Sequence, residues 1–225
     1  VAEPTATGNG TGAPPESAMA FSVVTANVKN ISHFLPASRF ALNDAGQMRT
    51  LIDKFLMYGV MEELEDQIVG GSGTGNDFTG LLNISGGTAQ AWDTDLFTTT
   101  RKGRTKVRTT GRARANAFVL NPSDWETLDL ATDNENRYYY GGPSAMGVPR
   151  LWGLPVVECE AMTAGTAMVS DFRLAVMWER QQVQISVSDS HSDFFVRRMI
   201  AILGEVRAAF DVLRPAAFVE MDLTA

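Results

Sequence analysis

The strongest helical signal in the chain is an apolar repeat between residues 44 and 69. Large apolar side chains recur there at intervals of three and four residues, the spacing of a helix: Met48, Leu51, Ile52, Phe55, Leu56, Val60, Leu64 and Ile68. Asp44 and Gln47 have the spacing of a capping box, and Gly70 and Gly71 supply a stop. Such a helix would be about 39 Å long, which is long for a small domain. The pattern therefore predicts a helical spine across the molecule.

Short runs of β-branched and aromatic residues predict strands in the rest of the chain. We expect a strand at 21–29, which 31–40 could continue, and a strand with one wet face at 182–188. Further strands are expected at 117–122, 151–159 and 216–221, and two short strands around a turn are expected within 168–179. Ser123 is expected to cap a brief helix, and residues 194–213 fit a strand and a helix about equally well. With no βαβ repeat, the mixture predicts an α+β fold.

Three segments have unusual composition. Residues 1–18 are rich in Gly, Pro, Thr and Ala, and this composition favours disorder over the tip of a projecting hairpin ordered by neighbours. The glycine-rich segment 70–80 follows a helix and lacks the Lys-Ser/Thr of a phosphate-binding loop. The basic cluster 101–114 is interpreted as a solvated helix face followed by a loop, with a contact to acidic neighbours or DNA as the alternative.

The bulk properties narrow the class of protein. The chain has 225 residues and a net charge of -7, so it is a poor non-specific binder of nucleic acid. Its single cysteine, Cys159, is expected to be a buried apolar residue in a protein made in a reducing cytoplasm. No apolar run is long enough to span a membrane. The chain starts at Val1 without the features of a signal peptide, which suggests a processed or truncated product.

The sequence contains no recognisable catalytic constellation. Its two histidines, His33 and His191, are far apart, and the motifs HExxH, CxxC and GxSxG are absent. The acid pairs at 62–63 and 65–66 are expected on the exposed face of the long helix. No residue is therefore assigned a catalytic, metal-binding or cofactor-binding role, and the chain is not expected to be an enzyme. A small hydrolase or nucleotide-binding domain remains a weak rival.

An ordered set of short strings resembles a known family. They are TANVK (25–29), LMYG (56–59), GTG followed by GL (73–81), VLNPSDW (119–125), DNENRYYYGGPSA (133–145), WGLPVV (152–157), AGT (164–166) and RP-A (214–218). No single string is specific, but together, in this order, they cover nearly the whole chain from Glu16 on. The chain resembles the major capsid proteins of tailed bacteriophages, of the chain-mail coliphage (HK-ninety-seven) type.

The resemblance implies a capsid fold with an extended loop hairpin, a long spine helix, a peripheral domain and an axial domain. The implied limits are 1–28 for the extended loop (a partial hairpin), 29–81 for the peripheral domain with spine helix 44–69, 82–180 for the axial domain, 181–213 for peripheral strands and 214–225 for a return strand to the axial domain. It also implies that 194–213 is a long strand of the peripheral domain.

The implied function is that of a shell subunit. It would self-assemble, as hexamers and pentamers, into the icosahedral shell of the virion around double-stranded DNA that it binds without sequence specificity. Assembly would take place in the host cytoplasm, with a scaffolding segment or protein, a head protease and a portal as partners. The family's N-terminal arm is not visible, so the chain looks truncated. An encapsulin-type bacterial nanocompartment shell protein is the alternative.

The family's cross-linking chemistry can be compared residue by residue. In the chain-mail type, a loop lysine attacks an asparagine carboxamide of another subunit while a glutamate acts as base. Residues 1–28 contain no lysine, Pro14 or a neighbour stands in its place, Arg198 holds the asparagine position and only Glu205 matches. The expectation is a shell without this cross-link, in which Glu205 pairs with an arginine. The candidate intersubunit contacts are Glu3, Pro14, Pro15, Glu16, Arg198, Glu205 and Arg207.

Overall fold

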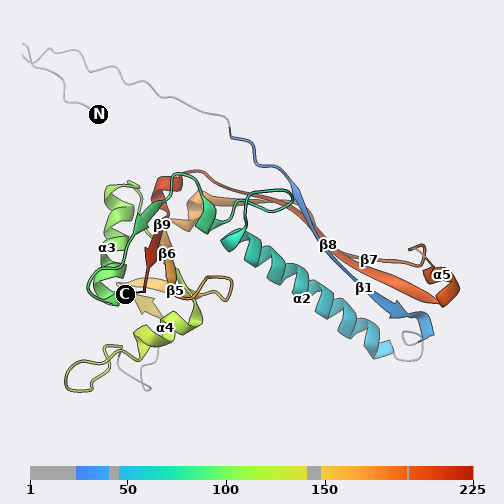
Figure 1. The fold of residues 1–225 in the computed structure, drawn as a ribbon, viewed down its shortest axis with the longest axis horizontal. Helices are drawn as coiled ribbons and strands as arrows, with labels where there is room; N and C mark the ends of the chain where they lie inside the picture. The colour runs from blue at the N-terminus through green and yellow to red at the C-terminus, as the bar shows by residue number, and fades with distance from the viewer. Residues whose placement is uncertain (1–23, 41–45, 141–147, 192, 225) are drawn as a thin grey trace, which may run out of the picture.

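The computed structural model of the chain describes residues 24–40, 46–140, 148–191 and 193–224. Figure 1 shows an elongated body with a long helix and strands at one end and a second sheet with its own helices at the other. The helices are α2 (Gly46–Gly70), α3 (Leu96–Thr109), α4 (Pro122–Asp129) and α5 (Phe194–Arg197). The strands are β1 (Lys29–Ser38), β2 (Thr88–Gln90), β3 (Ala117–Leu120), β4 (Arg150–Leu151), β5 (Leu154–Glu158), β6 (Thr166–Ser170), β7 (Ala175–Ser188), β8 (Met199–Val212) and β9 (Val219–Asp222). The predicted α+β class is confirmed.

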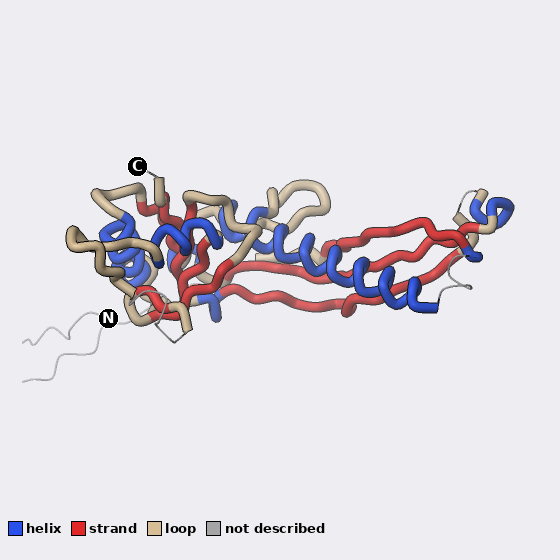
Figure 2. Tube along the Cα trace, turned by 90° about the horizontal axis from the view of Figure 1, so that it is seen from below, coloured by secondary structure: helices blue, strands red, loops and turns tan. Residues whose placement is uncertain are grey.

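The elongated end is a three-stranded antiparallel sheet in the order β1-β8-β7, with α2 lying along one face. Figure 2 shows the strands running beside the helix for much of its length. Leu56, Val60 and Leu64 form the buried row of α2. Below them is Gly204 of β8, where a Cβ atom would lie 3.3 Å from Val60 Cγ2. The glycine therefore lets the helix approach the middle strand closely.

The other end is a six-stranded sheet in the order β2-β9-β6-β3-β5-β4. Its pairs are mixed, because β3–β5 and β2–β9 are parallel while β6 is antiparallel to both of its neighbours. Phe118 and Leu120 of β3 are fully buried, and so is Met221 of β9. Helix α3 packs against β9 and β6, and Gly103 allows that contact, since a Cβ there would meet the side chain of Met221. The main core of the molecule lies in this sheet.

The predicted spine helix and the ambiguous segment have clear outcomes. The helix expected at 44–69 is confirmed as α2, although Asp44, its predicted cap, lies outside the described residues. The reading of 194–213 as a long strand is confirmed from Met199 onward. Its first residues form the short helix α5, which ends at Arg198 in the left-handed region (φ 57°).

Several predicted strands have different limits in the structure. Of the strand predicted at 21–29, residues 24–28 have no regular secondary structure and β1 begins at Lys29, while residues 21–23 lie outside the described residues. The continuous buried strand predicted at 151–159 is wrong: β4 and β5 form a hairpin around Trp152 and Gly153, which both have positive φ (53° and 78°). Two positive φ angles suit a tight hairpin turn between antiparallel strands. Within β5 only Val156 is buried.

The segments predicted as separate strands on either side of residue 180 belong to one strand. β6 ends at Ser170, and β7 then runs without interruption from Ala175 to Ser188, because β8 pairs with it along its length. Ser123 is not the cap of α4. Asn121 takes that role, since its side chain accepts a hydrogen bond from the Ser123 amide nitrogen at 3.0 Å.

Replacing Gly111 by alanine should destabilise the fold. A Cβ at Gly111 would lie 2.6 Å from Ala217 Cα and 2.8 Å from the carbonyl oxygen of Ala216, so backbone must move. We expect Gly111→Ala to lower the free energy of unfolding by about 1–3 kcal/mol in urea denaturation, a typical cost of overpacking. Gly70→Ala is the matched control, because that position has open space and alanine is the better helix former. Equal unfolding midpoints for the two variants would contradict this.

Candidate functional site

The outer face of α2 exposes a row of large apolar side chains. Its exposed members are Met48, Leu51, Phe55, Met57, Tyr58 and Met61. Leu51 and Phe55 keep 63% and 59% of their surface accessible. Because the helix also has a buried row, it is apolar on more than one side, which is typical of a helix covered from several directions. An exposed patch of this kind marks an interaction surface.

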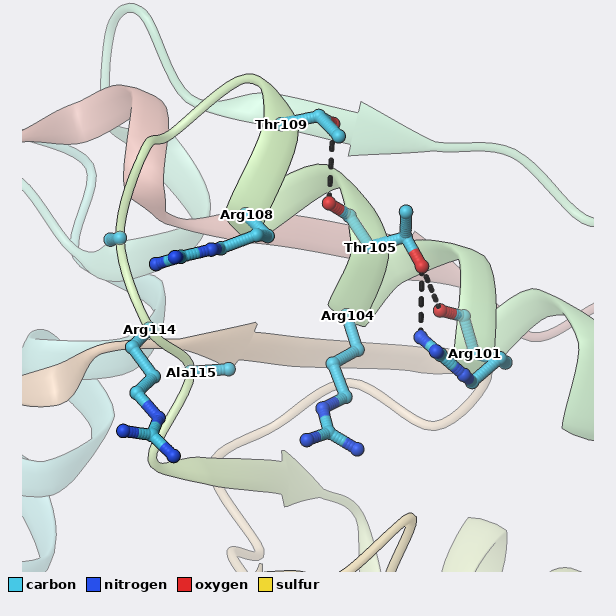
Figure 3. Close-up of a pocket in the computed structure, with 8 residues that line it drawn as sticks. Arg101, Arg104, Thr105, Arg108, Thr109, Arg114 and Ala115 are labelled. Atoms are coloured by element: carbon cyan, nitrogen blue, oxygen red, sulfur yellow. Dashed lines mark hydrogen bonds between the residues drawn. The ribbon is translucent and has the colours of Figure 1, made fainter.

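A groove lined with arginines follows the solvent face of α3. It has a volume of about 480 Å³, and the lining includes Arg101, Arg104, Arg108 and Arg114. Figure 3 shows these side chains around the space between α3 and the segment that leads to β3. Arg101 Nη1 donates to Thr105 Oγ1 at 2.8 Å. The predicted helix face followed by a loop is confirmed, and its contact with acidic neighbours or DNA stays a prediction.

A cleft lined with carboxylates lies between α2 and the end of β5. It has a volume of about 550 Å³, and its acidic residues are Glu62, Glu65, Asp66, Glu158 and Glu160. The acid pairs at 62–63 and 65–66 are exposed, as predicted. Cys159 is buried beside the cleft, and its Sγ donates to Glu65 Oε1 at 3.0 Å. Burial first, and this hydrogen bond second, raise the pKa of the Cys159 thiol to about 11.

The residues compared with the cross-linking site do not meet in this chain. Glu205 and Arg207 lie on the face of β8 that points away from α2, by strand alternation from Gly204. Gln181 Nε2 donates to Glu205 at 3.2 Å, and among the described residues Glu205 forms no ion pair. Arg198 is about 20 Å away along the strand at the usual rise per residue, with its guanidinium over the Phe40 ring. The expected arginine partner of Glu205 is therefore wrong within one chain, and Gln181 takes that place.

The remaining predicted contact residues cannot be placed. Glu3, Pro14, Pro15 and Glu16 lie outside the described residues, so their role stays a prediction.

The described residues do not suggest a site for catalysis. In the described ranges, no three His, Cys, Asp or Glu side chains come together as metal ligands. The glycine-rich loop packs on β1, since Asn76 Nδ2 donates to the carbonyl oxygen of Asn30 at 2.6 Å. Within the loop, Ser72 Oγ donates to Asp77 at 2.7 Å. None of the described helices combines the length and apolar character needed to cross a bilayer. What remains is a set of contact surfaces: an apolar row, a basic groove and an acidic cleft.

The sequence profile of the phage capsid family matches residues 1–223. The chain belongs to the phage capsid family. The resemblance carried by the ordered strings is thereby confirmed. Phage capsid proteins form the capsid of the virion, so the family is structural.

Individual relatives agree with the family assignment. The chain is 39% identical over 216 residues to the major capsid protein of Enterobacteria phage HK97, a match that takes in 92% of this chain and 54% of that protein. The chain thus spans about half the length of this relative. Among solved structures, it resembles one of Gordonia phage Cozz (TM-score 0.76, 15% identity, covering 95% of this chain and 79% of that one). It also resembles the capsid of a native GTA particle (TM-score 0.71, 18% identity, covering 98% and 81%). At such low identities, these structures show the shared capsid fold.

Sequence reasoning missed the division of α2 into two apolar rows. Met48, Leu51 and Phe55 were grouped with the buried row, because all of them recur at helical spacing. The signal was present, since eight apolar positions in one helix are more than a single face accommodates. The acidic cleft had no such signal, because it joins α2 to residues 158–160, nearly a hundred positions away.

The thiol of Cys159 should react slowly in the folded capsid chain. With a pKa of about 11, about one thiol in a thousand is ionised at pH 8, and the thiolate is the reactive form. We expect a disulfide-exchange reagent to label Cys159 slowly in buffer and rapidly in urea, measured by absorbance. Glu65→Gln should speed the reaction in buffer only. Equal rates in buffer and urea would show that the thiol is not held protonated.

Proposed function

We propose that this chain is the shell-building part of a phage major capsid protein, which self-assembles into the icosahedral head around double-stranded DNA. The observation that carries the proposal is the exposed apolar row of α2 on an elongated body of the capsid fold. A compact monomer would bury such a row, whereas a shell subunit covers it with its neighbours. Obligate interfaces of this kind bury more than about 2,000 Å² in total.

The two sheets support a division into the domains of a capsid subunit. We assign residues 29–81 and 181–213 to a peripheral domain, 82–180 and 214–225 to an axial domain near the symmetry axes, and 1–28 to an extended loop over a neighbour. Strand β7 passes from one domain to the other, and its pairing with β8 is irregular between Glu179 and Gln184. Such irregularities bend strands, which suits a junction.

The partners follow from the same proposal. The chain contacts copies of itself in hexamers and pentamers, and during assembly it works with a scaffolding segment or protein, a head protease and a portal. The acidic net charge of -7 suits an inner wall that does not retain packaged DNA. Assembly takes place in the cytoplasm of the bacterial host, without a membrane or cofactor. No feature of the described residues favours the nanocompartment alternative.

The shell should hold together without isopeptide cross-links. Residues 1–28 contain no lysine to act as nucleophile, and Arg198 offers no carboxamide. We expect shells of the full-length protein to run as a single subunit band on denaturing gels, and Glu205→Gln shells to form in equal yield. A ladder of subunit multiples would contradict this.

The apolar row of α2 should be needed for assembly but not for folding. Leu51→Lys/Phe55→Lys changes two exposed side chains, so the circular dichroism and unfolding midpoint should stay close to those of the wild type. We expect the assembled fraction of the full-length protein to fall about tenfold or more, as for a central interface residue, measured by sedimentation and negative-stain electron microscopy.

Gln47→Lys/Thr50→Lys is the matched control, because it adds the same charge at exposed polar positions of the same helix. Its assembly should resemble that of the wild type. If the apolar-row variant assembles as well as this control, α2 is not an interface, and the proposal loses its main support.

A further inference from the structure

The positive charge of this acidic chain is concentrated in one segment. Seven of its 19 lysines and arginines lie in residues 101–114, which contain no Asp or Glu. Four of these arginines line the groove on α3, and no carboxylate lines it. Within the described ranges, none of the four forms an ion pair. Neighbouring guanidinium groups repel one another unless a counter-charge is supplied, so the groove is suited to an anionic partner.

Two of these arginines, Arg101 and Arg104, contact Trp152. Arg104 Nη1 donates to the carbonyl oxygen of Trp152 at 2.6 Å, and Arg101 lies over the Trp152 ring with 6.0 Å between Cζ and the centroid. These contacts position two guanidinium groups without neutralising them. Arg108 and Arg114 are exposed, and Figure 3 shows Arg108 on α3 and Arg114 on the segment that leads to β3. Guanidinium groups arranged in this way match the geometry of carboxylates.

The acidic cleft is opposite to this groove in charge. Five carboxylates and no basic residue line the cleft, whereas four arginines and no carboxylate line the groove. Glu62, Asp66, Glu158 and Glu160 are exposed. Within the described ranges, none of the five acids forms an ion pair. Each surface thus lacks the charge that the other carries.

The two surfaces cannot meet within one chain. Along the long axis of the molecule, α3 and α2 lie on opposite sides of the six-stranded sheet in both views (Figures 1 and 2). A groove on one side and its complement on the other is the arrangement of a head-to-tail contact, in which each copy offers one surface to each neighbour. Such contacts close into a ring when the rotation between copies permits.

We propose that the arginines of the groove on one subunit pair with the carboxylates of the acidic cleft on the next subunit around a ring. This inference rests on the proposed shell function and names the contact that joins neighbours within a ring. The competing ligand for the groove is the phosphate backbone of DNA. A second copy is favoured because the acidic net charge of -7 repels DNA and because the copy carries a surface of opposite charge.

The test reverses each surface separately in the full-length protein. Arg101→Glu/Arg108→Glu/Arg114→Glu leaves one arginine against three glutamates and makes the groove acidic. Glu62→Arg/Glu158→Arg/Glu160→Arg leaves two acids against three arginines and makes the cleft basic. All six side chains are exposed, so both variants should fold, as checked by circular dichroism. Each variant alone opposes like charges, and we expect its fraction of rings and shells to fall about tenfold or more, since like charges across an interface are strongly unfavourable. Wild-type rings should also weaken as salt screens the contact.

Two combinations identify the pairing. A chain with all six reversals has complementary surfaces again and should regain rings. Co-expressed, the two triple variants attract each other but not themselves, so they should form rings in which the two alternate. Alternation requires an even number of subunits, so native mass spectrometry should find hexamers and no pentamers. Arg112→Glu/Arg150→Glu/Arg180→Glu is the matched control, because all three residues are exposed and none lines the groove.

The other outcomes separate failure of this inference from failure of the shell function. If the wild type assembles and the triple variants assemble equally well, the pairing is wrong and the shell function stands. If the triple variants fail and neither combination restores rings, the pairing is also overturned. If only the binding of a fluorescent DNA duplex depends on Arg101, Arg108 and Arg114, the groove is a DNA surface. A full-length wild type that never assembles would remove the shell function itself.

Discussion

The packing of α2 on the middle strand of a three-stranded sheet governs the rest of this molecule. Leu56 and Val60 press on β8 at Gly204, where the absence of a side chain lets the helix come close. A helix on a single narrow sheet can bury only one row of side chains. The other row, with Leu51 and Phe55, stays exposed. In the proposed shell, neighbouring subunits would cover this exposed row.

Like the exposed apolar row, the charged surfaces of this chain have no partner within it among the described residues. The arginines of α3 and the carboxylates of the cleft have no partners of opposite charge among the described residues of their own chain. Apolar contacts are non-directional, whereas complementary charges favour one register and disfavour others. The apolar row would supply most of the binding free energy between subunits. The charged surfaces would select the rotation between subunits that a closed ring needs.

The chemistry of the chain is consistent with a structural role. Glu205 is the only match to the cross-linking residues of the resembling family, and it accepts a hydrogen bond from Gln181 on the open face of the sheet. Arg198, which holds the position of the family's asparagine, lies just before β8 with a left-handed backbone conformation. Cys159 is held protonated by burial. Among the described residues, no ion pair joins Glu205 to Arg198.

The sequence by itself determined the long helix, most strands and the family, because helical spacing and short ordered strings are local properties. Helical spacing predicted the end of α2 to within one residue, and the predicted start at residue 44 lies outside the described residues. Helical spacing could not separate the buried row from the exposed one. That separation depends on which side β8 occupies, and only the tertiary structure decides it. The hairpin at Trp152 likewise needed the backbone, because positive φ at a tryptophan is uncommon. The acidic cleft joins residues nearly a hundred positions apart, and no local pattern can reveal a surface that exists only once the chain has folded.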